Sequence, residues 1–332
     1  MPDIHRPERI GTTKLRVTRL GLGTVALGFL YEQVSDQQAY AAIRCARDLG
    51  LNLFDTAPLY GDGTAETRLG AVISSWPRDS YVLTTKVGFD IQEGLRPLDD
   101  WHFYVNAPRD FSYDGVLRNL DRSLRRLRVD RIDIVHIHDA DDHFLEAMNG
   151  AYRALDRLRS EGVIQAVSAG MNQAEMLARF ACEGDFDCFL LAGRYTLLEQ
   201  RALESLFPIC RQKQISVVIG GVYNSGILAD PEAPIPQYNY QPAAEALISK
   251  ARRIDAVCKC HGVPIKAAAL QFPLAHPVVA SVLCGARSAA EMQEDVEMSR
   301  FPIPAGLWSD LKSEGLLPAE APAERCEDKS QT

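Results

Sequence analysis

The chain of 332 residues is 46% hydrophobic, which is enough for one large core. Its net charge of -8 and the lack of a basic stripe argue against nucleic acid and anionic membranes as partners. The sequence has no apolar window of about 18 residues and no apolar segment near its N-terminus. We therefore expect a cytoplasmic protein without a transmembrane helix or signal peptide.

The first extended segments lie within residues 9–24, with a turn at Gly11-Thr12, and predict an N-terminal β-hairpin followed by a strand. Residues 21–26, GLGTVA, match the G-x-G-x-x-A pattern of a Rossmann phosphate loop. However, the loop continues to Ser35 before a helical pattern begins, and residues 41–45 supply no acidic residue about 20 positions on. We interpret this stretch as a first barrel strand whose end allows a close backbone approach.

Apolar runs alternate with helical patterns through the rest of the chain. Ser35 with Gln38 predicts a capping box, and Asn172 and Ser288 are expected to cap two later helices. The remaining strands are expected at residues 51–55, 81–86, 132–138, 163–169, 187–192, 215–219 and 278–284. Helices are expected at 36–49, 65–74, 116–127, 144–160, 199–213, 243–261 and 264–275, and after the two later caps.

Eight mostly apolar strands with helices between them predict an α/β protein, a (β/α)8 TIM barrel with a parallel sheet buried on both faces. A doubly wound open sheet is the alternative fold. Residues 1–317 are expected to form this single domain, and 318–332 a disordered C-terminal tail. The long stretches 88–111 and 220–242 are expected to be loops on the catalytic face.

Four polar side chains fall where this fold places an active site. Asp55, Lys86 and His138 each close a predicted strand, and Tyr60 lies in the loop after Asp55. Any one of them alone is an ordinary structural residue. Because the carboxyl ends of the strands meet on one face of the barrel, the recurrence of such residues at several strand ends predicts a shared site.

The four residue types predict carbonyl and alcohol interconversion. A tyrosine titrates near pH 10, and a nearby ammonium stabilises its phenolate, which makes Tyr60 a usable general acid or base beside Lys86. Asp55 supplies the counter-ion for the lysine, and His138 can orient a substrate oxygen. Since no side chain donates hydride, the chemistry implies a nicotinamide cofactor.

Metal and disulfide chemistry are not expected. The eight cysteines are scattered, which fits reduced thiols, and the Cys258-Lys-Cys260-His261 run is too short for a zinc site. The pair His136 and His138 resembles the H-x-H of metallohydrolase barrels, but no histidine lies between His143 and His261 to complete the ligand set. We interpret His136 as a hydrogen-bonded core residue.

Residues 9–315 closely resemble the aldo-keto reductase superfamily. The motifs are DTAPLYGDGTAETRLG, TTKVG, DIVHIHD and CGARSAAEMQED, and the family's catalytic tetrad falls on Asp55, Tyr60, Lys86 and His138. The resemblance implies NAD or NADP bound without a Rossmann fold. It also implies a set of cofactor contacts, in which Asn172 stands one position after the usual Asn. These contacts are Gly23, Thr24, Asp55, Asn172, Asn224, Ser225, Gly226, Leu228, Gly285, Arg287 and Glu291.

Several positions depart from the common family pattern. Ala192 stands where a Gln is usual, and Gly220 where an aromatic stacks on the nicotinamide. Glu291 and Asp295 replace the usual Gln and Asn of the last helix. These acids would repel a 2′-phosphate while Arg287 would attract it, so we favour NAD over NADP and expect NADP to be accepted as well.

The stretches SAGMNQ and GGVYNSGILA are similar to the aldose 1-dehydrogenase branch of the family. This implies oxidation of the anomeric hydroxyl of a small sugar, of the L-fucose, D-arabinose or L-galactose type, to a lactone. Pyridoxal 4-dehydrogenase or a broad aldehyde reductase is the alternative, and a non-catalytic, cofactor-binding regulatory subunit is the alternative of another class. A homo-oligomer is left open. The residues that we expect to contact substrate are Trp101, His102 and Asp139, with Asn172 as a further candidate.

Overall fold

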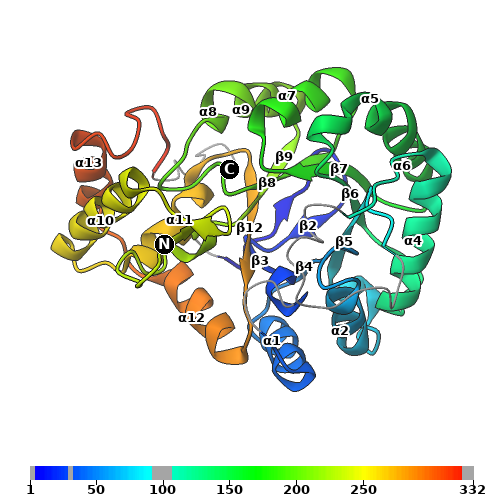
Figure 1. The fold of residues 1–332 in the computed structure, drawn as a ribbon, viewed down its shortest axis with the longest axis horizontal. Helices are drawn as coiled ribbons and strands as arrows, with labels where there is room; N and C mark the ends of the chain where they lie inside the picture. The colour runs from blue at the N-terminus through cyan, green and yellow to red at the C-terminus, as the bar shows by residue number, and fades with distance from the viewer. Residues whose placement is uncertain (1–3, 29–32, 92–106, 324–332) are drawn as a thin grey trace, which may run out of the picture.

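The computed structural model describes residues 4–28, 33–91 and 107–323. Eight parallel strands form a closed barrel in the order β12-β3-β4-β5-β6-β7-β8-β9, and Figure 1 shows the helices around it. The predicted (β/α)8 barrel is therefore confirmed, and the open-sheet alternative is wrong. The barrel strands are β3 (Leu20–Gly23), β4 (Leu53–Asp55), β5 (Val82–Val87), β6 (Ile134–His138), β7 (Ala166–Met171), β8 (Cys188–Ala192), β9 (Ser216–Gly220) and β12 (Val279–Gly285).

The surrounding helices occur where the sequence pattern predicts them, except α13 (Ala305–Ser313), which was not expected. Three of the expected helices are interrupted. The one expected at 264–275 ends as an α-helix at Gln271, before a 3-10 turn at Pro273–Ala275. The expected helix 199–213 is two helices, because Pro208 lacks the amide proton that a continuous helix would use and is tolerated only in a first turn. The expected helix 144–160 contains a π-helical turn at residues 147–152. The helices are α1 (Asp36–Asp48), α2 (Thr64–Ile73), α4 (Tyr113–Leu127), α5 (Phe144–Glu146), α6 (Arg153–Ser160), α7 (Ala174–Glu183), α8 (Ala202–Ser205), α9 (Phe207–Lys213), α10 (Glu245–Cys260), α11 (Ile265–Gln271), α12 (Ala289–Arg300) and α13 (Ala305–Ser313).

Two of the three predicted caps are confirmed. Ser35 forms the capping box of α1 with Gln38, and the Ser288 hydroxyl accepts from the backbone N–H of Glu291 at the start of α12. The prediction that Asn172 caps α7 is wrong, because Gln173 is the N-cap residue and makes no side-chain cap bond. The Asn172 side chain instead donates across the barrel rim, as described below.

An N-terminal hairpin of β1 (Glu8–Arg9) and β2 (Arg16–Val17) covers one end of the barrel. Its apolar residues Ile10, Leu15 and Val17 are buried in one cluster with residues that begin the barrel strands, such as Leu53 and Val82. With the amino ends of the strands closed in this way, the carboxyl ends are left for a site. A second short hairpin, β10 (Gln237–Tyr238) with β11 (Gln241–Pro242), lies in the loop after β9.

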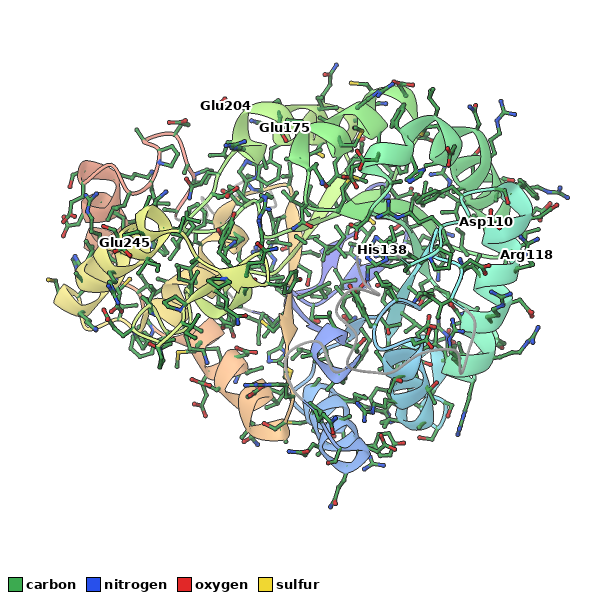
Figure 2. All side chains as sticks on the ribbon, in the orientation of Figure 1. Asp110, Arg118, His138, Glu175, Glu204 and Glu245 are labelled. Carbon is green, nitrogen blue, oxygen red and sulfur yellow. The ribbon has the colours of Figure 1, made fainter. Side chains whose placement is uncertain are left out.

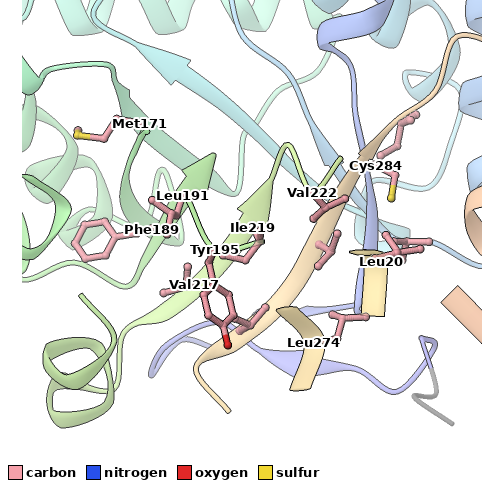
Figure 3. Packing of buried hydrophobic residues seen from close by; sticks show 14 of the residues in the cluster. Leu20, Met171, Phe189, Leu191, Tyr195, Val217, Ile219, Val222, Leu274 and Cys284 are labelled. Atoms are coloured by element: carbon pink, nitrogen blue, oxygen red, sulfur yellow. The ribbon is translucent and has the colours of Figure 1, made fainter. Parts of the chain in front are cut away.

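A larger apolar layer lies between the strands and the helices. Figure 3 shows part of it, where Val217 and Ile219 of β9 lie near Tyr195. The Tyr195 ring packs against Phe207 of α9 and Phe272, with centroids 4.6 and 5.1 Å apart. This layer continues past α13 to the fully buried Ala321, so ordered packing extends beyond residue 317. In the described residues, no helix is both long and apolar enough to cross a membrane.

Candidate active site

A buried ion pair lies at the carboxyl ends of β4 and β5. The Lys86 ammonium is 2.9 and 2.7 Å from the two carboxylate oxygens of Asp55 and 2.8 Å from the carbonyl oxygen of Thr56. Thr84 adds a hydrogen bond of 2.6 Å to Asp55 Oδ1. The side chains of Lys86 and Asp55 are 1% and 4% exposed, so both charges depend on this pairing.

Tyr60 lies above this pair in the loop between β4 and α2. The Lys86 ammonium is 4.8 Å from the centre of the tyrosine ring. The three residues after Tyr60 all have positive φ angles, from 53° to 83°, and a Cβ atom at Gly28 would lie only 2.5 Å from the Tyr60 carbonyl carbon. The position of the hydroxyl-bearing ring therefore depends on a loop shape that needs glycine at several points.

His138 closes β6 beside this loop, and Figure 2 shows it within the ring of helices. Its ring packs edge-on to Tyr60 and Phe89, with centroids 6.0 and 5.2 Å apart. Burial, and next the Lys86 charge, hold the pKa of His138 well below its usual value. The imidazole is therefore neutral at physiological pH and offers one N–H donor and one acceptor.

His136, the first histidine of the H-x-H pair, lies one layer deeper. Its Nδ1 is 2.7 Å from the Ser168 hydroxyl, and its Nε2 is 3.7 Å from Asp55 Oδ1. Burial and the Lys86 charge hold the pKa of His136 well below its usual value as well. The hydrogen bond to Ser168 confirms that His136 is a hydrogen-bonded core residue. Among the described residues, no group of three or more potential metal ligands comes together.

A charged network that the sequence pattern does not reveal lies behind the ion pair. Glu66 of α2 is fully buried and accepts hydrogen bonds of 2.6 Å from both Thr85 and Arg126. Thr85 precedes Lys86 on β5, and Arg126 lies on α4, so the network joins the strand to two helices. The only sign of this network in the sequence is a glutamate on the apolar face of a predicted helix. Its two partners are 19 and 60 positions away in the sequence.

Four predicted cofactor residues meet at the rim through the strand register. Gly285 pairs with Gly23, and Gly23 pairs with Asp55 across β12, β3 and β4. The backbone N–H of Thr24 donates to the carbonyl oxygen of Asp55 at 2.9 Å. The register thus brings these residues together although they are up to 262 positions apart, from 23 to 285.

Two asparagine amides converge on the carboxyl end of β8. Asn172 Nδ2 donates to the Ala192 carbonyl oxygen at 2.8 Å, and Asn224 Nδ2 donates to the Gly193 carbonyl oxygen at 3.0 Å. Asn224 Oδ1 is buried and has no hydrogen-bond partner among the described residues. The turn that follows has positive φ at Ser225 and Gly226, and it continues to the buried Leu228.

Arg287 and Glu291 form a pair at the start of α12. Glu291 accepts the backbone N–H of Arg287 at 2.8 Å and its guanidinium at 2.6 and 3.0 Å. Burial raises the pKa of Glu291, but these hydrogen bonds outweigh it and bring the pKa below its usual value. Behind them, Asp295 accepts a 2.8 Å hydrogen bond from the Tyr223 hydroxyl, which ties the loop after β9 to α12.

Of the three expected substrate residues, only Asp139 lies within the described residues. It follows His138 directly, and its Oδ2 is 3.7 Å from His138 Nε2. Trp101 and His102 lie outside the described residues. The tetrad residues and Asp139 therefore come together at the carboxyl ends of neighbouring strands β4, β5 and β6.

Comparison with known proteins identifies the family of this chain. Residues 19–313 match the model of the aldo/keto reductase family, and the chain belongs to that family. Enzymes of this family are oxidoreductases that use NAD(H) or NADP(H).

Two relatives are similar over nearly their whole length. D-threo-aldose 1-dehydrogenase of a Pseudomonas species is 38% identical, over 92% of this chain and 96% of its own. Pyridoxal 4-dehydrogenase of Microbacterium luteolum is also 38% identical, over 93% and 97%. A solved aldo-keto reductase from Bacillus halodurans, in its holo form, superposes with a TM-score of 0.74 at 25% identity, over 98% of this chain and 99% of that one.

Proposed function

We propose that this enzyme oxidises the anomeric hydroxyl of a small aldose to a lactone, with NAD as the favoured cofactor and Tyr60 as the general base. The observation that carries this proposal is the buried Lys86 and Asp55 pair below the Tyr60 ring, with the neutral His138 beside that ring. The similarity to D-threo-aldose 1-dehydrogenase supports the substrate class.

The side chains divide the reaction between them. His138 donates an N–H to the anomeric oxygen and orients it, and Tyr60 takes the proton of that hydroxyl as the C–O bond becomes C=O. Lys86 stabilises the phenolate form of Tyr60 that this requires, and Asp55 keeps the ammonium in place. A nicotinamide bound at this site would supply the acceptor for the hydride of the same carbon. The sugar ring stays closed, so the product is a lactone.

The described residues at the carboxyl ends of the barrel strands and at the start of α12 can hold a dinucleotide. The unpartnered Asn224 Oδ1 can accept a hydrogen bond from an amide donor. The amino end of α12, a helix of 12 residues with its cap at Ser288, supplies positive potential for a phosphate. Asn172, Asn224 and the residues up to Leu228 would lie along the nicotinamide and pyrophosphate, and Arg287 with Glu291 along the adenosine.

The Arg287 and Glu291 pair supports NAD over NADP. A 2′-phosphate would have to displace a carboxylate that already holds the guanidinium by three hydrogen bonds. The negative charge of Glu291 would also repel this phosphate. The ribose 2′-hydroxyl of NAD, in contrast, can donate to that carboxylate without breaking the pair.

Glu291→Gln is therefore expected to raise the ratio of kcat/KM for NADP to that for NAD by roughly tenfold, the size of one charge-assisted hydrogen bond. The change frees the guanidinium and removes the like charge. Initial rates and fluorescence titrations with both cofactors measure the effect. Glu294→Gln, on the same helix but paired with Lys266, is the matched control and should leave the ratio unchanged. If the Glu291→Gln variant has the same ratio as the native enzyme, the pair of Arg287 and Glu291 does not set the preference for NAD.

The test of the function is reduction of NAD and NADP at 340 nm with L-fucose, D-arabinose, L-galactose, D-glucose and pyridoxal. We expect turnover of the first three sugars and not of D-glucose. Turnover of pyridoxal alone would move the function to pyridoxal oxidation, the reaction that the second relative's name states. No turnover of any compound would contradict the lactone-forming proposal.

A further inference from the structure

Asp139 has a backbone conformation that only a few per cent of non-glycine residues adopt. Its φ is 44°, in the left-handed region, and its N–H donates to the Gly170 carbonyl oxygen of β7 at 3.0 Å. Strained backbone of this kind persists where the surrounding structure holds it, often at functional sites. Here the turn comes immediately after His138 and brings the Asp139 carboxylate back beside the histidine ring.

The Asp139 carboxylate has no hydrogen-bond partner among the described residues, and its side chain is 37% exposed, so a ligand can reach it. The charged and titratable groups that face it are His138 on its own strand, Asp141 in the next turn, Arg109 before α4 and Lys86 on β5. Burial first, and then the Asp141 charge, raise the pKa of Asp139 to about 6 against the opposing effect of the two cations. Such a carboxylate in a site is a candidate for binding a ligand.

We propose that Asp139 and His138 together bind two oxygens on neighbouring carbon atoms of the substrate, so that the enzyme requires a hydroxyl next to the carbon that it oxidises. This rests on the proposed function and names the part of the sugar that the site recognises. Asp139 is a specificity-determining residue in this proposal.

The two groups are complementary to such a pair of oxygens. The His138 N–H donates to the oxygen that becomes the carbonyl, and the Asp139 carboxylate accepts from the neighbouring hydroxyl. The 3.7 Å between His138 Nε2 and Asp139 Oδ2 is a span that a vicinal pair of oxygens can bridge. A substrate that lacks the second hydroxyl leaves the carboxylate unpaired in a partly dry site, which is costly.

The experiment compares D-arabinose with 2-deoxy-D-ribose, which is D-arabinose without its 2-hydroxyl. In the native enzyme, kcat/KM should be roughly 10- to 100-fold lower for the deoxy sugar, the effect of one hydrogen bond to a charged group. Asp139→Gly should reduce this ratio to near one by lowering only the D-arabinose value, and Asp139→Asn should give an intermediate ratio. Both replacements tolerate a positive φ, so folding is not expected to fail.

The pH dependence supplies a readout that a purely structural role would not change. Only the ionised carboxylate binds the hydroxyl strongly, so kcat/KM for D-arabinose should fall as the pH drops through about 6. Asp139→Asn should abolish this fall. Asp141→Asn, the matched control, removes the like charge and should move the fall to lower pH while keeping the preference for the 2-hydroxyl.

The same comparison in the reducing direction separates this proposal from the proposed function. Glyceraldehyde has the neighbouring hydroxyl and propanal lacks it. Preference for glyceraldehyde that is lost in Asp139→Gly would support the proposal even if no sugar were oxidised. Equal rates for both members of each pair in the native enzyme would overturn it, as would an unchanged preference in Asp139→Gly. An enzyme that turns over neither pair would contradict both proposals.

Discussion

Tyr60→Phe is expected to lower kcat by about 10²–10⁴-fold, the usual contribution of a general acid or base, while the affinity for NADH stays the same. The variant keeps the ring that packs edge-on to His138 and removes only the hydroxyl that takes the proton. Initial rates at 340 nm give kcat, and quenching of intrinsic fluorescence gives the NADH dissociation constant.

Tyr113→Phe is the matched control for this variant. Tyr113 lies on α4, and its hydroxyl accepts a hydrogen bond of 3.2 Å from Arg157, away from the site. It should keep full activity. A Tyr60→Phe enzyme with native kcat would assign the proton transfer to another group and would falsify the mechanism.

Lys86→Met should abolish measurable turnover and also destabilise the fold. The change removes the charge near the Tyr60 ring and leaves the Asp55 carboxylate buried without its counter-ion. Removing one partner of a buried ion pair costs about 3–5 kcal/mol of unfolding free energy. Urea unfolding followed by circular dichroism measures the stability, and the sugar assay measures the activity.

The double variant Lys86→Met with Asp55→Asn separates the two effects. Because it removes both charges, it should recover much of the unfolding free energy that the single variant loses. It should stay inactive, since no ammonium remains to stabilise the phenolate. Recovery of turnover together with stability would mean that Lys86 acts on the fold alone.

The barrel and the four candidate catalytic residues were accessible from the sequence because both depend on short-range patterns. A buried strand is an apolar run, and a polar residue at its end is visible without knowledge of its neighbours. Asp55, Lys86 and His138 could be placed on one face because parallel strands of a barrel all end on the same face. No comparable rule placed Glu66 with Arg126, since their pairing depends on how α2 packs against α4.

Asn172 shows how local signals can mislead. An asparagine three residues before a glutamate is a good cap in isolation. In the barrel, the same side chain reaches the Ala192 carbonyl oxygen on the neighbouring strand, which is 20 residues away in the sequence. The bond across the rim replaces the local one, and α7 begins without a side-chain cap.

By itself, the sequence determined the fold class, the order of the elements and the types of residue at the strand ends, because hydrophobic periodicity and residue chemistry are local properties. The tertiary structure decided which charges are paired and which are not. It joined Arg287 to Glu291, neutralised both histidines by burial, and left the Asp139 carboxylate beside His138 in a strained turn. These outcomes depend on distances and on access to water, which arise only when segments far apart in the chain pack together.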